Sequence, residues 1–189
     1  MDISILDKFE STLEQGLVKI CTGAELLKGQ ILFSDDLTDK WEAMAKEYVA
    51  DAIENFNQYP EVAIAWAAFL GMGAAHLWDA DFDSFRRHNY KDYYGERGFD
   101  DMDEHILYKI IGLGKEKAGK ISATLDSCAI ACLELIRHEG IEAMTADGFY
   151  ILIRCYQSMF RIGASIELNR LGYYLQGLTR KVPPLSPSA

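Results

Sequence analysis

The feature that most constrains this sequence is a run of fourteen uncharged, mostly apolar residues from Val62 to Ala75. A membrane-spanning helix needs about 20 such residues, so this run is too short to cross a bilayer. Pro60 stands where the first turn of a helix tolerates proline. Because the segment is apolar on all sides, the sequence predicts a helix over 60–78 at the centre of a soluble protein, enclosed by other helices.

Most of the remaining chain shows helical periodicity, and strand alternation is nearly missing. The sequence therefore predicts an all-α fold, a single-domain bundle of about five to seven helices around the central apolar helix. The bundle is expected to span 1–181, and the Pro- and Ser-rich segment 182–189 is expected to be a disordered tail. Further helices are expected at 3–20, with a continuation to 27 weakened by Gly16 and Gly23, and at 39–56, 103–114, 120–140 and 146–181.

Several residues predict where these helices begin and end. Asp39 with Glu42 has the spacing of a capping box, and Asp101 with Glu104 repeats it. The last helix would be very long if unbroken, so we expect it to bend near one of its glycines. The remaining boundary residues are Thr145 as an N-cap, Gly140 as a helix end, and Gly163 or Gly172 as the bend.

The central segment also carries small residues at every fourth position, namely Ala63, Ala67, Gly71 and Ala75. These positions share one helix face, and small side chains allow a neighbouring backbone to approach closely. The neighbour is either another helix of this chain or the same helix of a second subunit. The second alternative would make this face the seam of a homodimer.

Composition narrows the classes of partner. Apolar residues make up 49% of the chain and charged residues 25%, which is typical of a globular protein. The formal charge of −10 opposes binding to nucleic acid, whose phosphates attract Lys and Arg. The N-terminal segment carries acidic residues where a signal peptide would need basic ones. We therefore expect a cytoplasmic protein that binds neither nucleic acid nor membranes.

The four cysteines all lie in apolar runs. Cys128 and Cys132 are four residues apart, which differs from the C-x-x-C spacing of redox and zinc motifs. In such runs cysteine acts as a small hydrophobic residue, so we expect reduced thiols in the core.

Polar residues at the end of the central helix form the first candidate site. His76 and Asp79 are three residues apart on one helix face, and Glu104 with His105 begins another predicted helix. Imidazole and carboxylate groups that converge from several helices could bind a metal or act as a general base. The alternative is that His76 only caps the helix and benefits from the negative end of its dipole.

Known metal motifs do not fit this region. Asp79, Asp81 and Asp83 match the first three ligands of a calcium-binding loop, but Ser84 replaces its glycine and Tyr90 its bidentate glutamate. No glutamate has a histidine three residues later, which excludes the usual di-iron motif of helical bundles. No cofactor is therefore predicted, and no metal ligand is assigned.

An aromatic and basic segment, 79–99, is the second candidate site. Tyrosine and arginine are favoured in binding hot spots because they combine a large contact area with polar tips. The alternative is that the rings lie over the end of the bundle and only the charges reach solvent. The candidate binding residues are Phe85, Arg86, Arg87, Tyr90, Tyr93, Tyr94 and Arg97.

Two functions follow as hypotheses. In the first, the protein is a non-enzymatic helical bundle that binds a protein partner or itself, with segment 79–99 as the recognition surface. In the second, it is a metal- or small-molecule-dependent enzyme with its site near His76 and Asp79. Motifs for a serine nucleophile, a phosphate-binding loop and a dinucleotide site are all missing from the sequence, which favours the first hypothesis.

Overall fold

The computed structural model describes residues 3–142 and 145–178, and this part of the chain is an all-α bundle. It contains seven α-helices and no β-strand, which confirms the predicted fold class. The predicted tail at 182–189 lies outside the described residues. The helices are α1 (Ile3–Gly23), α2 (Asp35–Phe56), α3 (Pro60–Ala80), α4 (Phe82–Arg87), α5 (Met102–Glu104), α6 (Lys115–His138) and α7 (Ala146–Arg170).

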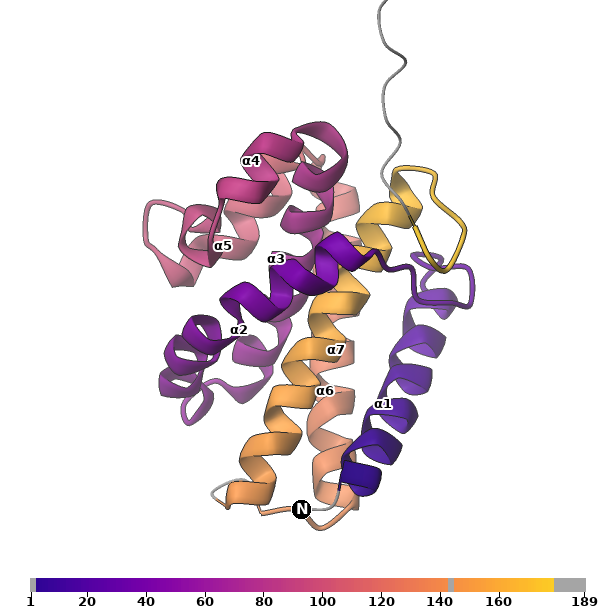
Figure 1. Ribbon diagram of the computed structural model, residues 1–189, viewed down its shortest axis with the longest axis vertical. Helices are drawn as coiled ribbons and strands as arrows, with labels where there is room; N and C mark the ends of the chain where they lie inside the picture. The colour runs from indigo at the N-terminus through magenta and orange to yellow at the C-terminus, as the bar shows by residue number, and fades with distance from the viewer. Residues whose placement is uncertain (1–2, 143–144, 179–189) are drawn as a thin grey trace, which may run out of the picture.

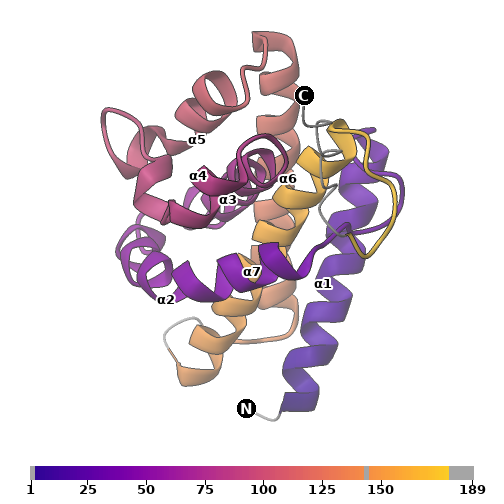
Figure 2. The same ribbon diagram turned by 45° about the horizontal axis from the view of Figure 1, so that its top comes forward.

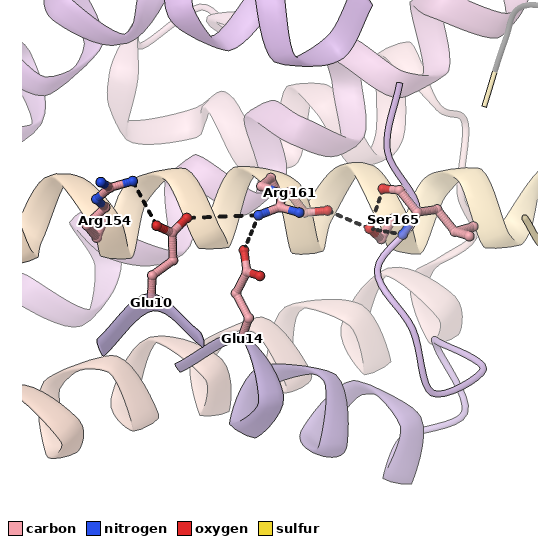
Figure 3. Close-up of polar contacts among 6 residues, drawn as sticks. Glu10, Glu14, Arg154, Arg161 and Ser165 are labelled. Atoms are coloured by element: carbon pink, nitrogen blue, oxygen red, sulfur yellow. Dashed lines mark hydrogen bonds and ion pairs between the residues drawn. The ribbon is translucent and has the colours of Figure 1, made fainter. Parts of the chain in front are cut away.

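Three long helices, α1, α6 and α7, lie alongside one another (Figure 1). α2 and α3 pack against α7, and α4 and α5 pack against α3. α1 and α7 run in the same direction, since Glu10 pairs with Arg154 at 2.8 Å and Glu14 pairs with Arg161 further along both helices. Figure 3 shows these α1 carboxylates pointing toward the guanidinium groups of α7. Burial raises the pKa of Glu14, and the charge of Arg161 opposes that rise.

The central helix is enclosed as predicted. Every residue of α3 from Ala63 to Ala75 is buried, and Ala67 has no exposed surface. Within the described residues, α3 is the one helix long and apolar enough to cross a membrane, but 78% of its apolar window is buried inside the bundle. Figure 2 shows α3 surrounded by α2, α4, α6 and α7. Its buried side chains belong to one continuous hydrophobic core.

The small-residue face of α3 packs against α7 of the same chain. A Cβ added at Gly71 would overlap the carbonyl oxygen of Phe160, and one added at Gly163 would overlap that of Ala68. The two helices therefore cross with their backbones nearly in contact, which only glycine allows at these two positions. The first of the two predicted neighbours is confirmed, and this face is not free to form a homodimer seam.

Three helix starts differ from the sequence prediction, and one of them is that of α6, which begins at Lys115, five residues before the predicted start at 120. α2 begins at Asp35, four residues before the predicted capping box at Asp39, because Ser34 accepts a hydrogen bond from the Leu37 amide at 3.2 Å. The box predicted at Asp101 is also wrong, since its carboxylate accepts from the Arg97 amide before the helix instead of from a first-turn amide. Thr145 does cap α7, accepting from the Gly148 amide at 3.0 Å.

Some helix ends agree with the sequence prediction and others differ from it. α1 ends at Gly23, one of its two weak points, and does not continue to Leu27, while α7 ends at Arg170. Gly163 lies inside α7 without interrupting it, whereas Gly172 follows the end of that helix with a φ of 91°. Gly140, with a φ of 65°, follows the end of α6 as predicted.

All four cysteines, which lie in the described part of the chain, are buried free thiols, as predicted. The Sγ atoms of Cys21 on α1 and Cys128 on α6 are 3.6 Å apart. They help to pack these two helices together.

Candidate functional site

The segment between α3 and α6 is built from short helices held by polar side chains. Asp81 precedes α4, and its carboxylate accepts from the amide of Ser84 at 3.0 Å and from its hydroxyl at 2.7 Å. These hydrogen bonds lower the pKa of Asp81. Asp81 therefore acts as an N-cap. This role explains one of the three alternating aspartates, Asp79, Asp81 and Asp83, without calcium binding.

A short 3₁₀-helix, η1 (Tyr90–Tyr93), follows with a capping box of its own. The Asp92 carboxylate accepts from the Asn89 amide at 2.8 Å, and Asn89 Oδ1 accepts from the Lys91 amide at 2.9 Å. On the α2 side, Lys40 Nζ donates to the carbonyl of His88 at 2.6 Å. Side-chain hydrogen bonds thus replace the long backbone ladders of the other helices.

A tight turn then leads to a second 3₁₀-helix, η2 (Phe99–Asp101). Gly98 has a φ of 77°, and Gly95 faces the Asp101 carboxylate so closely that a Cβ would lie 2.5 Å from it. The same carboxylate accepts from the Arg97 amide at 3.1 Å. Both glycines are therefore required for this turn to fold around Asp101.

The next element, η3 (His105–Ile110), has π-helical geometry. The Ile111 amide donates to the carbonyl of Ile106, five residues earlier, at 2.9 Å, and the Leu113 amide donates to that of Leu107 at 2.8 Å. Ile106 and Leu107 are buried against the core. π-Helical turns are rare, and they occur frequently at functional sites.

A cleft of about 680 Å³ lies between the turn and the π-helix. This volume is in the range of known ligand sites, roughly 300–1,000 Å³. Two tyrosines supply aromatic surface, three carboxylates and one lysine supply charge, and a histidine supplies a further polar group. The lining residues are Tyr94, Gly95, Glu96, Asp101, Glu104, His105, Tyr108 and Lys109.

The structure divides the predicted polar site into two parts. Glu104 and His105 line the cleft, and Arg97 Nη2 lies 3.6 Å from Glu104 Oε2. His76 instead contacts the C-terminal part of α7, and Asp79 contacts the segment that follows it. His76 Nδ1 lies 2.8 Å from Glu167 Oε1, and the Tyr173 hydroxyl donates to Asp79 at 2.6 Å.

Sequence reasoning missed the residue at the centre of this second group. Glu167 has no exposed surface, and Arg170 donates two hydrogen bonds to its carboxylate, at 2.7 and 2.6 Å. Pairing with Glu167 raises the pKa of Arg170. An acidic residue inside an apolar helix, with arginine three positions later, was the signal that could have revealed it.

Neither part of the predicted polar site gathers a set of metal ligands. Within residues 3–142 and 145–178, no group of three or more His, Cys, Asp or Glu side chains is placed to hold a metal ion. The buried Glu167 instead holds the His76 ring by its Nδ1 atom.

The predicted binding segment contributes fewer rings to the surface than its sequence suggested. Phe85, Tyr90 and Tyr93 are buried, and Tyr94 is half-buried. Tyr93 lies against the backbone of Gly73, which leaves space for its ring on α3. Arg86, Arg87 and Arg97 are exposed. The rings of the segment thus mostly extend the core, while its charges reach solvent.

No known protein family, curated protein or solved structure matches this chain. The fold and the cleft therefore define only a class, an all-α bundle with a mixed aromatic and charged cleft beside a π-helix.

Proposed function

We propose that the protein is a non-enzymatic interaction module that binds a short basic segment of a partner protein in the cleft beside η3. The observation that carries the proposal is the composition of this cleft, in which two tyrosines and an excess of carboxylates surround about 680 Å³. The cleft joins residues from both candidate sites, since Tyr94 comes from the predicted binding segment and Glu104 and His105 from the predicted polar site.

Charge favours a basic occupant. Glu96, Asp101 and Glu104 line the cleft, and Lys109 is the one basic residue among its lining residues. The chain as a whole carries a formal charge of −10, which would steer a basic segment toward it. Complementary charge of this kind raises association rates and selects among partners.

The aromatic walls suit the same occupant. Tyr108 is 42% exposed, and Tyr94 lines the cleft on the side of the turn. Lysine and arginine side chains are attracted to the faces of aromatic rings, and their long apolar stems pack along them. Burial is the main cause of the raised pKa of Tyr94, so this ring stays neutral at physiological pH.

Arg97 of the chain itself makes the kind of contact that a basic occupant would make with the carboxylates of the cleft. Its guanidinium lies 3.6 Å from both the Asp101 and the Glu104 carboxylates, yet its side chain is 67% exposed. The contacts are long and the residue is held loosely, so a partner's guanidinium could replace it at small cost.

An NMR titration with an arginine–glycine hexapeptide tests the proposal, with a glutamate–glycine hexapeptide as the control ligand. We expect saturable amide shifts confined to Tyr94–Lys109, and about fivefold weaker binding by Glu104→Gln. Glu47→Gln, which removes the same charge from an exposed position on α2, should bind like the wild type. Shifts spread evenly over the acidic surface, or equal affinity for both peptides, would refute the proposal.

Formation of a homodimer, a cytoplasmic location and the lack of nucleic-acid binding stay predictions. So does the alternative of an enzyme with its site near His76 and Asp79.

A further inference from the structure

A second pocket lies where α1, α6 and α7 come together near the start of α6. Its volume is about 240 Å³, and its floor is apolar. The floor is formed by side chains from α6, from α7 and from the segments after α1 and before α6, namely Ile121, Ile166, Leu26 and Leu113. Asn169 donates a hydrogen bond to the Leu26 carbonyl at 3.0 Å, which fixes the chain just after α1 at the edge of this floor.

The rim of the pocket is basic, although the protein as a whole is strongly acidic. Lys117, Lys120 and Arg170 line it, with Glu25 as the one acidic lining residue. Glu25 pairs with Lys120 at 3.4 Å, and Arg170 is engaged by Glu167. Lys117 has no ion pair among the described residues, so its charge is free to meet a ligand. It lies in the first turn of α6, where the helix dipole adds partial positive charge.

The backbone at Glu25 fixes the position of one side of the rim. Among the described residues, Glu25 is the one non-glycine with a positive φ, 60°. It follows the end of α1 at a position where glycine is usually found. The Leu26 amide donates to the Cys21 carbonyl at 2.8 Å and the Glu25 amide to the Thr22 carbonyl at 3.0 Å, so this conformation closes the end of α1. Here the conformation places a carboxylate against Lys120 at the rim.

We infer that this pocket binds a small amphiphilic anion, an apolar chain with a carboxylate or phosphate head. The apolar floor would take the chain, and Lys117 would pair with the head. At roughly 30 Å³ per heavy atom, about the share of one liquid water molecule, 240 Å³ holds about eight heavy atoms. A short- or medium-chain acyl group meets this size. The inference uses none of the residues of the cleft beside η3 and does not rest on the proposed function.

The test is an NMR titration that follows the methyl groups of Leu26, Leu113, Ile121 and Ile166. The probes are octanoate and octyl phosphate, with octanol and octylammonium as controls that lack the anionic head. We expect saturable shifts of these methyl groups with at least one anionic probe and much weaker shifts with both controls. Whichever anionic probe binds more tightly identifies the head group.

Variants separate the charge from the apolar floor. Lys117→Gln should weaken binding of the anionic probe about tenfold, the loss expected for one charge-assisted contact. Lys46→Gln removes the same charge from an exposed position on α2 and should bind like the wild type. Leu113→Glu places a carboxylate in the floor, at a residue that is only partly buried, and should abolish binding while the protein stays folded. Equal binding of octanol and octanoate, equal binding by Lys117→Gln, or no methyl shifts with any probe would overturn the inference.

Discussion

The crossing of α3 and α7 and the segment between α3 and α6 are held together by opposite means. At the crossing, Gly71 and Gly163 bring two backbones together, and the surrounding side chains are apolar and fully buried. In the segment 81–111, no helix exceeds six residues, and polar side chains such as Asp81, Asn89 and Asp101 fix each turn.

This difference shows where the molecule can support function. The crossing tolerates no added atom, so it serves as a scaffold. The segment 81–111 exposes charges, forms a π-helical turn and lines the larger cleft. Binding residues are commonly found on irregular segments that a rigid scaffold positions, and this chain follows that division.

The largest effect on the free energy of unfolding is expected at the crossing of α3 and α7. Gly163→Ala should lower the free energy of unfolding by about 4 kcal/mol, above the usual cost of overpacking because the new methyl group overlaps backbone atoms of Ala68. Gly16→Ala in α1 is the matched control, since nothing lies within 4 Å of a Cβ at that position. It should raise stability by about 0.5–1 kcal/mol. Urea denaturation followed by circular dichroism measures both, and equal effects would contradict the close approach.

The second-largest effect on stability is expected from breaking an ion pair, and it should depend on whether the pair is buried or exposed. Arg170→Met leaves the buried Glu167 carboxylate with one partner fewer and should cost about 3 kcal/mol, the low end for a broken buried pair because Arg170 is partly exposed. Arg97→Met breaks the exposed pairs with Asp101 and Glu104 and should change stability by less than about 0.5 kcal/mol. Thermal and urea unfolding of the two variants, side by side, checks this contrast. A larger loss for Arg97→Met would reverse the assigned roles of the two regions.

A smaller effect is expected where the irregular segment is attached to α2. The Tyr90 hydroxyl donates to the Asp51 carboxylate, and the ring itself is buried. Tyr90→Phe keeps the ring and removes the hydrogen bond, so it should cost about 1 kcal/mol because Asp51 is half-exposed and regains water. Equilibrium unfolding measures the loss, and a loss above that of Arg170→Met would show that this single bond anchors the whole segment.

The smallest effect on stability is expected on α6, at a carboxylate that interacts with α3 and α5. Burial raises the pKa of Asp126 on α6, and the carboxylate of Glu61 on α3 adds to the rise. Asp126 raises the pKa of Asp103 on α5 in turn, after burial and closer groups. A carboxylate with a raised pKa in the folded state destabilises that state once it is ionised.

Asp126→Asn should therefore be slightly more stable than the wild type at pH 7. The difference should shrink as the pH falls and disappear below about 3.9, the pKa of an unfolded aspartate, because both states then bind the proton. Melting temperatures measured from pH 3 to pH 8 follow this change. A variant less stable than the wild type at pH 7 would contradict it.

The sequence predicted the scaffold better than the site, and the reason is physical. An uninterrupted apolar run and a four-residue spacing of small side chains can be recognised locally, so α3 and its close contact were both predicted. The start of α2 was misplaced because Ser34 and the Asp39–Glu42 pair both resemble caps, and only the packing of Leu37 decides between them. The π-helix and the burial of Tyr90 and Tyr93 depend on contacts with α2 and α3, which no local pattern encodes.

The candidate sites show the same limit. His76 and Glu104 were grouped because both are polar residues at predicted helix ends, yet His76 contacts Glu167, 91 positions away. The cleft itself depends on the turn that Gly95, Gly98 and Asp101 form. The position of that turn beside η3 depends on the tertiary fold, so the sequence alone did not predict the cleft.

Native-state hydrogen exchange tests the central claim most directly, because it measures the opening free energy of each region separately. The amides of α3 from Ala67 to Gly73 and of α7 around Gly163 should exchange only through global unfolding, while those of 90–111 exchange through smaller openings. Exchange of the α3 amides at the rate of the amides of 90–111 would show that other helices do not enclose the central helix.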